Sequence, residues 1–98
     1  MNVAASGVWQ KNPALAWREI DDETVIISPG ESVMHELNNT GSLVWRNIDG
    51  QRKAEDLARL LVEQYDVTQE VALADTLSLL AELSTRKLLL PAEEGAAR

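Results

Sequence analysis

The sequence predicts an α+β, winged helix-turn-helix-like fold, in which a three-stranded antiparallel sheet is followed by three helices. Two observations predict it: strand-like segments separated by polar turns fill residues 15–37, and after Asn38 the hydrophobic residues recur with a helical period. The chain has 98 residues, the size of a single domain. We expect that domain to span residues 15–90, with a flexible N-terminal segment at 1–14 and a flexible C-terminal tail at 91–98.

Three short segments have the composition of strands. The first covers residues 15–20 and ends at a polar turn. The second, residues 24–28, is rich in β-branched side chains and leads to the turn-forming pair Pro29-Gly30. The third covers residues 32–37. Because short turns join them, we expect the strands to pair in order as an antiparallel meander.

Three helices follow, marked by capping residues and apolar stripes. Asn38 and Asn39 are both good N-caps because a short amide side chain can accept from the free first-turn N–H groups, and this first helix ends before Asp49-Gly50. The second helix runs over about residues 53–65, where apolar residues share one face. Thr68 caps the third helix, which runs to about Arg86 with leucines along one side.

Composition excludes several classes of site. The chain has no Cys and one His, which excludes disulfides, thiolate zinc sites, iron–sulfur ligation, cysteine nucleophiles and a metal site built from several His of one chain. The 16 acidic and 9 basic residues give a net charge of −7, which disfavours binding to phosphates. Residues 1–16 hold no basic leader followed by an unbroken apolar stretch, so we expect no secretory signal, and no apolar run approaches the roughly 20 residues of a membrane helix. We expect a cytoplasmic protein that binds neither nucleic acid nor membrane.

We expect no catalytic residue, no metal and no cofactor. A general base needs a partner, and His35 and Glu36 are neighbours in a predicted strand, where successive side chains point to opposite faces. Ser42 follows Gly41, whereas the phosphopantetheine serine of acyl carrier proteins follows an Asp in an all-helical fold. These residues therefore favour structural or surface roles.

The helical half does not suit DNA. In a helix-turn-helix the second helix of the pair enters the major groove, where phosphates repel carboxylates. The 26 positions from Leu60 to Thr85 hold no basic residue. The acidic residues of this stretch are Glu63, Asp66, Glu70, Asp75 and Glu82.

The three tryptophans favour packing roles to different degrees. Trp45 lies in the first predicted helix beside its apolar stripe, which indicates core packing over ligand stacking. Trp17, in the first predicted strand, is ambiguous between the two. Trp9 falls in the predicted flexible segment, where we expect it to be exposed.

A three-stranded meander leaves two strand edges unpaired. The last strand leads directly into the helical half, so its free edge can border the final helix. A peptide added there would gain backbone hydrogen bonds from the strand and side-chain contacts from the helix. The alternative is an edge that is merely short and solvated, and these physical arguments alone do not rank the two.

One stretch carries a family signature. Residues 37–45 read L-N-N-T-G-S-L-V-W and are followed by Ile48-Asp49-Gly50. This resembles the L-N-x-T-G-x-x-I-W…x-D-G signature of the PqqD family, named for a pyrroloquinoline quinone biosynthesis protein. The resemblance continues through Tyr65-Asp66-Val67 and a D-x-x-x-[FL]-L-x-x-L run at residues 75–83. It covers about residues 15–90.

The resemblance implies the fold already predicted, and it also implies a function. Members of the PqqD family are recognition elements that bind the leader of a ribosomally made precursor peptide and present it to a maturation enzyme, often a radical S-adenosylmethionine protein. The leader adds beside the third strand and packs against the third helix. The alternative function is a winged-helix interaction subunit that docks a partner enzyme without binding a leader. Transferred to this chain, the implied peptide-binding residues are Ser32, Val33, Met34, His35, Glu36, Leu37, Asp75, Thr76, Leu79 and Glu82.

The chain departs from the family pattern at three positions. His35 stands where many members have an aromatic residue shortly before the Leu-Asn pair. Lys87 replaces the Gly that precedes the terminal apolar pair, and Lys53 replaces the Thr or Ser before the second helix, which leaves that N-cap weak. These changes bear on which peptide is bound more than on the fold.

The acidic third helix suggests a preference in the bound peptide. We expect a leader to place at least one Lys or Arg against Asp75 or Glu82, each contact being worth about 0.2–1 kcal/mol and weakening with salt. The alternative is that these carboxylates only keep a small domain soluble.

Overall fold

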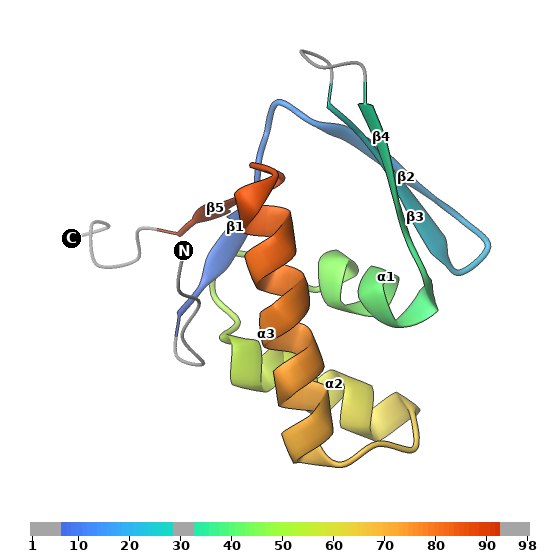
Figure 1. Ribbon diagram of the computed structural model, residues 1–98, viewed down its shortest axis with the longest axis vertical. Helices are drawn as coiled ribbons and strands as arrows, with labels where there is room; N and C mark the ends of the chain where they lie inside the picture. Colours follow the sequence, from blue (N-terminus) through green and yellow to red (C-terminus); the bar gives the residue numbers. More distant parts are fainter. Residues whose placement is uncertain (1–6, 29–32, 93–98) are drawn as a thin grey trace.

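The computed structural model describes residues 7–28 and 33–92, and Figure 1 shows how the elements are arranged. The sheet, the three helices and their order confirm the predicted α+β fold. Of the predicted third strand, residues 33–37 form β4; Ser32 and the Pro29-Gly30 turn lie outside the described residues. In chain order the elements are β1 (Trp9–Lys11), β2 (Ala16–Ile20), β3 (Glu23–Ser28), β4 (Val33–Leu37), α1 (Asn39–Arg46), α2 (Ala54–Gln64), α3 (Gln69–Thr85) and β5 (Leu89–Pro91).

Strands β2, β3 and β4 form an antiparallel sheet in that order. Side chains of the central strand alternate, as expected for a sheet with one covered face: Thr24 and Ile26 are buried, whereas Ile27 is 44% exposed. Directly paired residues of two strands lie on the same face. Ile26 pairs with His35 and Ile27 with Met34, so His35 lies on the covered face and Met34 on the open one.

Local capping explains where the helices begin. Asn38 and Thr68 each accept a hydrogen bond from a first-turn backbone N–H, at 2.9 and 3.2 Å, as the sequence predicts. Lys53, at the start of α2, offers no such acceptor, and instead the carboxylate of Asp56 accepts from the Lys53 backbone N–H at 2.9 Å. Within the described residues, no helix is long and apolar enough to span a membrane.

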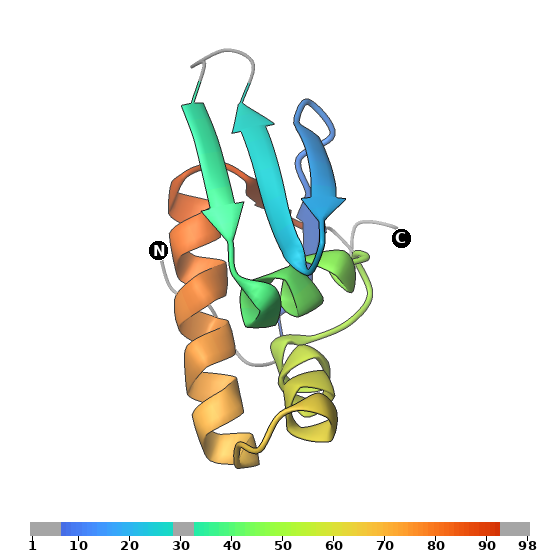
Figure 2. The ribbon, with the colours of Figure 1, turned by 90° about the vertical axis from the view of Figure 1, so that its right-hand side faces the viewer.

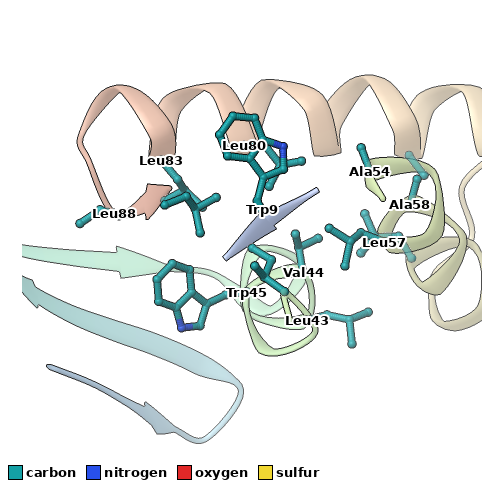
Figure 3. Packing of buried hydrophobic residues seen from close by; sticks show 14 of the residues in the cluster. Trp9, Leu43, Val44, Trp45, Ala54, Leu57, Ala58, Leu80, Leu83 and Leu88 are labelled. Atoms are coloured by element: carbon teal, nitrogen blue, oxygen red, sulfur yellow. The ribbon is translucent and has the colours of Figure 1, made fainter. Parts of the chain in front are cut away.

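The core lies where the sheet, the helices and β1 meet. Trp45 of α1 is fully buried, which confirms its predicted packing role, and Figure 3 shows it in one cluster with Trp9 and the leucines of α3. Trp17 of β2 packs edge-on against Trp45, with ring centroids 5.8 Å apart, and remains 40% exposed. The buried hydrophobic residues are Trp9, Ile26, Leu43, Val44, Trp45, Ile48, Ala54, Leu57, Ala58, Leu61, Ala72, Leu80, Leu83, Leu88 and Leu89.

A second, two-stranded sheet corrects the prediction for the N-terminal segment. Strand β1 pairs antiparallel with β5, and the backbone N–H of Gly50 donates to the carbonyl of Trp9 at 2.8 Å. Trp9 is only 6% exposed, so the prediction that it lies exposed in a flexible segment is wrong. Burying the indole and pairing β1 offset the entropy of ordering these residues. Residues 1–6 and 93–98 of the predicted flexible ends lie outside the described residues.

The backbone at the end of α3 shows why a glycine is favoured at the position that Lys87 occupies in this chain. Lys87 has a φ of 63°, in the left-handed region that favours glycine. Its backbone N–H donates to the carbonyl of Ser84 at 2.9 Å, and the N–H of Leu88 donates to the carbonyl of Leu83 at 2.9 Å. This pair of bonds is a Schellman motif, which ends the helix and directs the chain into β5.

Candidate peptide-binding groove

Strand β4 lies at the edge of the three-stranded sheet. Among the described strands, only β3 pairs with it, so the backbone groups along its outer side have no strand partner. Such an edge can accept an added strand. Its apolar side chains are uncovered as well, because Val33 is 40% and Met34 61% exposed. An exposed apolar edge strand is a feature that isolated domains ordinarily avoid.

A cavity of about 500 Å³ lies between β4 and the C-terminal half of α3. Figure 2 shows β4 at the margin of the sheet, on the same side of the molecule as α3. One wall is the edge strand and the other is the helix. The lining residues are Met34, His35, Glu36, Leu37, Asn38, Gly41, Leu79, Glu82, Leu83, Arg86 and Leu88.

A second cavity, of about 300 Å³, continues past the end of β4 to the start of α1. It has Asn38, Gly41, Leu79 and Glu82 in common with the first cavity, so the two form one continuous depression, called the groove below. Its remaining lining residues are Thr40, Val44, Leu61, Asp75, Thr76 and Ser78.

Gly41 is one of the residues that line both cavities. A Cβ at this position would lie 3.3 Å from Oδ1 of Asn38 and 3.4 Å from Cβ of Leu37. Any larger residue would therefore press on the N-cap and on the last residue of β4. The absence of a side chain keeps the capping geometry and the floor of the groove intact.

Two residues that line the groove each have a buried side-chain atom with no hydrogen-bond partner in the described part of the chain. The two atoms are Nε2 of His35 and Oγ1 of Thr76, the latter in a residue that is 1% exposed. Other such atoms in the described residues are the indole nitrogens of Trp9 and Trp45, which lie in the core. A buried polar atom without a partner is costly, so a group that enters the groove and bonds to it is favoured.

The charges along the helical wall are mainly negative. Asp75, Leu79 and Glu82 succeed one another on one face of α3, because they are spaced four and three residues apart. The carboxylate of Glu82 lies 3.3 Å from the guanidinium of Arg86, whereas no basic side chain of the described residues pairs with Asp75. His, Asp and Glu side chains of the described residues form no group suited to a metal ion.

The structure brings the predicted strand and helix residues to opposite walls of this groove. Of the predicted residues, Met34, His35, Glu36, Leu37, Asp75, Thr76, Leu79 and Glu82 line it. Val33 lies on the exposed edge strand but lines neither cavity, and Ser32 is outside the described residues. Sequence reasoning missed Asn38 and Gly41, although both belong to the quoted signature, which joins the edge strand to the first helix.

Comparison with known proteins agrees with this architecture. The family model described as Coenzyme PQQ synthesis protein D (PqqD) matches residues 23–89. The chain belongs to the PqqD family. A search of curated protein sequences found no match.

Solved structures with the PqqD-like fold include two complexes. TbiB1 in complex with the TbiA(beta) leader peptide is 22% identical, with a TM-score of 0.75 over 82% of this chain and 93% of that chain. Lasso peptide synthetase B1 complexed with the leader peptide is also 22% identical, with a TM-score of 0.76 over 85% and 98%.

A third similar structure is a solution NMR structure of the PqqD truncation of Methylobacterium extorquens PqqCD. It is described as a functional and stand-alone recognition element for ribosomally synthesized and post-translationally modified peptides. It is 22% identical to this chain, with a TM-score of 0.75 over 90% of this chain and 94% of that chain.

The structure gives physical roles to the PqqD signature residues. Asn38 caps α1, and Trp45 fills the core beneath the sheet. After α1, the carboxylate of Asp49 accepts the backbone N–H groups of Arg52 and Gln51, both at 2.9 Å. These hydrogen bonds hold the pKa of Asp49 below its usual value, and the one from the Arg52 backbone has the largest effect. Gly50 then turns the chain with a φ of 81°.

Proposed function

We propose that this PqqD-family chain is a non-catalytic module that binds the leader of a ribosomally synthesised precursor peptide and presents it to a modifying enzyme. The observation that carries the proposal is the unpaired edge of β4 beside a groove walled by α3. The similar solved structures that hold leader peptides support it.

The groove suits an extended peptide in two ways. An added strand would hydrogen-bond to the free backbone groups of β4, and such bonds form with any sequence. Selectivity would come from side chains that enter between strand and helix, where Leu79 and Leu83 offer apolar surface. Met34 is exposed on the open face of the sheet and also lines the larger cavity, so it would contact the peptide along the strand edge.

The test is chemical-shift mapping with candidate leaders. Synthetic peptides from short reading frames beside this gene would be added to ¹⁵N-labelled protein, with a scrambled peptide of the same composition as the control. We expect the amide signals of β4 and α3 to move together with the cognate peptide and not with the scrambled one. Shifts confined to α1 and α2, or no binding by any candidate, would contradict the proposal.

A second candidate function is supported by the open face of the sheet. Ile20 is 52% and Ile27 44% exposed there, and Met34 extends the same surface. A subunit that docks an enzyme through this face without gripping a leader would use these residues. Replacing Ile20 and Ile27 with Thr distinguishes the two functions: leader affinity survives if the leader uses β4 and α3, whereas enzyme docking is lost if it uses the sheet face.

The modifying enzyme is proposed by class alone. We infer that it acts on the presented precursor, as a radical S-adenosylmethionine protein does in other members of the family. Co-purification of this chain with the enzyme encoded beside it, with and without the leader, tests whether the three assemble. If the enzyme modifies the precursor equally well in the absence of this chain, the presenting role fails.

A further inference from the structure

The smaller cavity of the groove is surrounded by hydrogen-bond acceptors. Among the described residues its lining includes Asp75, Glu82, Asn38 and Thr76, whose buried Oγ1 has no hydrogen-bond partner there, and no basic residue. Backbone and hydroxyl groups of the α1 cap already donate to Asn38 at 2.9 and 3.1 Å. The atoms left for an incoming group are therefore those of α3, which favour a donor.

The floor of the same cavity is apolar. Val44, Leu61 and Leu79 contribute to it, so a long aliphatic stem can pack there while a polar end group reaches the rim. A volume of about 300 Å³ lies at the lower limit of small-molecule pockets and suits a single side chain.

Two independent observations point to a polar group here: Asp75 favours a cation, and the buried hydroxyl of Thr76 favours a group that can hydrogen-bond to it. Asp75 is exposed and, among the described residues, has no basic partner, whereas Glu82 has Arg86. Thr76 is 99% buried with an unpartnered hydroxyl in the wall of the same cavity. An ammonium or guanidinium group can donate to a carboxylate and a hydroxyl at once, and a hydrogen bond to a charged group is stronger than one between neutral groups.

We propose that the smaller cavity is a specificity pocket for one Lys or Arg side chain of the bound peptide. The aliphatic stem of this peptide side chain lies over Leu79. Its cationic end group donates to the carboxylate of Asp75 and to Oγ1 of Thr76. This inference rests on the proposed function and adds the chemical class of side chain that the groove selects. Because β4 runs toward Asn38, the selected residue lies just beyond the peptide segment that pairs with the strand.

The first experiment needs no known precursor. A random-peptide display library is selected against the full-length chain, and binders to the groove are identified by shifts of β4 and α3 signals. We expect those binders to be enriched in Lys or Arg at one position. The same selection against Thr76→Val should lose this enrichment while retaining apolar positions. Replacing the orphan hydroxyl with a methyl group leaves stability equal or higher, so a folding defect would not explain the loss.

The second experiment measures coupling. One selected peptide is compared with a copy in which the basic residue is norleucine, on the parent chain and on Asp75→Asn, Thr76→Val and the control Glu63→Gln, which lies outside the groove. Norleucine should weaken binding to the parent about tenfold or more. On Thr76→Val most of that penalty should disappear. On Asp75→Asn the norleucine penalty should shrink about two- to fivefold at about 0.05 M salt. At about 0.5 M salt the reduction should be smaller, because salt screens the charges. Glu63→Gln should match the parent.

Three outcomes separate the ideas. Groove binders without basic enrichment, or an equal norleucine penalty on all four proteins, would overturn the pocket and leave the proposed function standing. If Glu63→Gln reduces the norleucine penalty as much as Asp75→Asn does, the basic residue is attracted to the acidic surface in general. That result would also overturn the pocket. If no peptide shifts β4 and α3, the proposed function fails and this inference fails with it.

Discussion

Strands β5 and β4 both lie near α3, but they differ in how far their edges and side chains are covered. Strand β5 follows the helix and is covered by β1, with Trp9 and Leu89 buried beneath the pair. Strand β4 lies across the groove from the same helix, pairs on only one edge among the described strands, and exposes Val33 and Met34. The β1–β5 side therefore contributes buried core residues, whereas the β4 side leaves an edge available for binding. Changes on the two sides should have separable effects.

The largest expected effect is on the covered side. Trp9→Ala should lower the free energy of unfolding by about 3–5 kcal/mol, because it removes a buried indole and leaves a cavity. Urea unfolding measures it, and Trp17→Ala, which removes an indole that is 40% exposed, is the matched control and should cost less than half as much. Peptide affinity of the folded fraction should not change. A loss for Trp9→Ala no larger than that for Trp17→Ala would contradict the structural role given to the Trp9 indole.

A pair of prolines tests the open side. Successive residues of a strand direct their N–H groups to opposite edges, so Met34→Pro and His35→Pro should behave differently. One removes a bond to β3 and lowers the stability of the sheet. The other removes an outward N–H, keeps the fold, and should weaken leader binding about tenfold or more. Calorimetric titration with the leader, after stability has been checked by urea unfolding, gives both readings. A folded variant pair that binds as tightly as the parent would rule out strand addition at β4.

A smaller effect is expected where α3 turns into the covered strand. Lys87→Gly should raise the free energy of unfolding by about 0.5–1 kcal/mol, because a non-glycine residue is disfavoured at a φ of 63°. Lys87→Ala is the control, since it removes the charge and keeps the backbone penalty. An equal gain from both variants would attribute the effect to charge and not to conformation.

The smallest effect concerns Lys11 in β1. Its ammonium donates to the carbonyl of Ile48 at 2.9 Å and lies 5.2 Å from the ring centroid of Trp17. Desolvation by burial is the main cause that lowers the pKa of Lys11 below its usual 10.5, against the opposing carboxylates of Asp49 and Glu19. Between the lowered pKa and 10.5 the unfolded chain binds more protons than the folded one, so stability rises with pH there.

The comparison is with Lys11→Met, which has no titrating group at this position. As pH approaches 10.5 from below, the parent should gain stability relative to Lys11→Met by less than about 1 kcal/mol, measured by urea unfolding at several pH values. Contributions from the other titrating groups are common to both proteins and cancel. A relative loss with rising pH would show that the folded state favours the charged form.

Much of the fold and part of the groove could be predicted from local sequence. The helix starts at Asn38 and Thr68 follow from side chains that accept first-turn N–H groups, and both caps are present. The alternation around Ile26 predicts a strand with one covered face. His35 and Asp75 were predicted site residues because of the family resemblance, and the structure places both in the groove wall.

The sequence by itself determined the order of strands and helices, because periodicity and capping depend on residues within a few positions of one another. Only the tertiary structure decided that Trp9 is buried, since a three-residue strand has too few positions to show a period and its partner lies 80 residues away in Leu89–Pro91. It also decided that Thr76 and Asp75, whose side chains have no polar or basic partner among residues 7–28 and 33–92, line the same cavity. Burial and satisfaction of a polar atom depend on what other elements bring beside it, and that is a property of packing and not of local pattern.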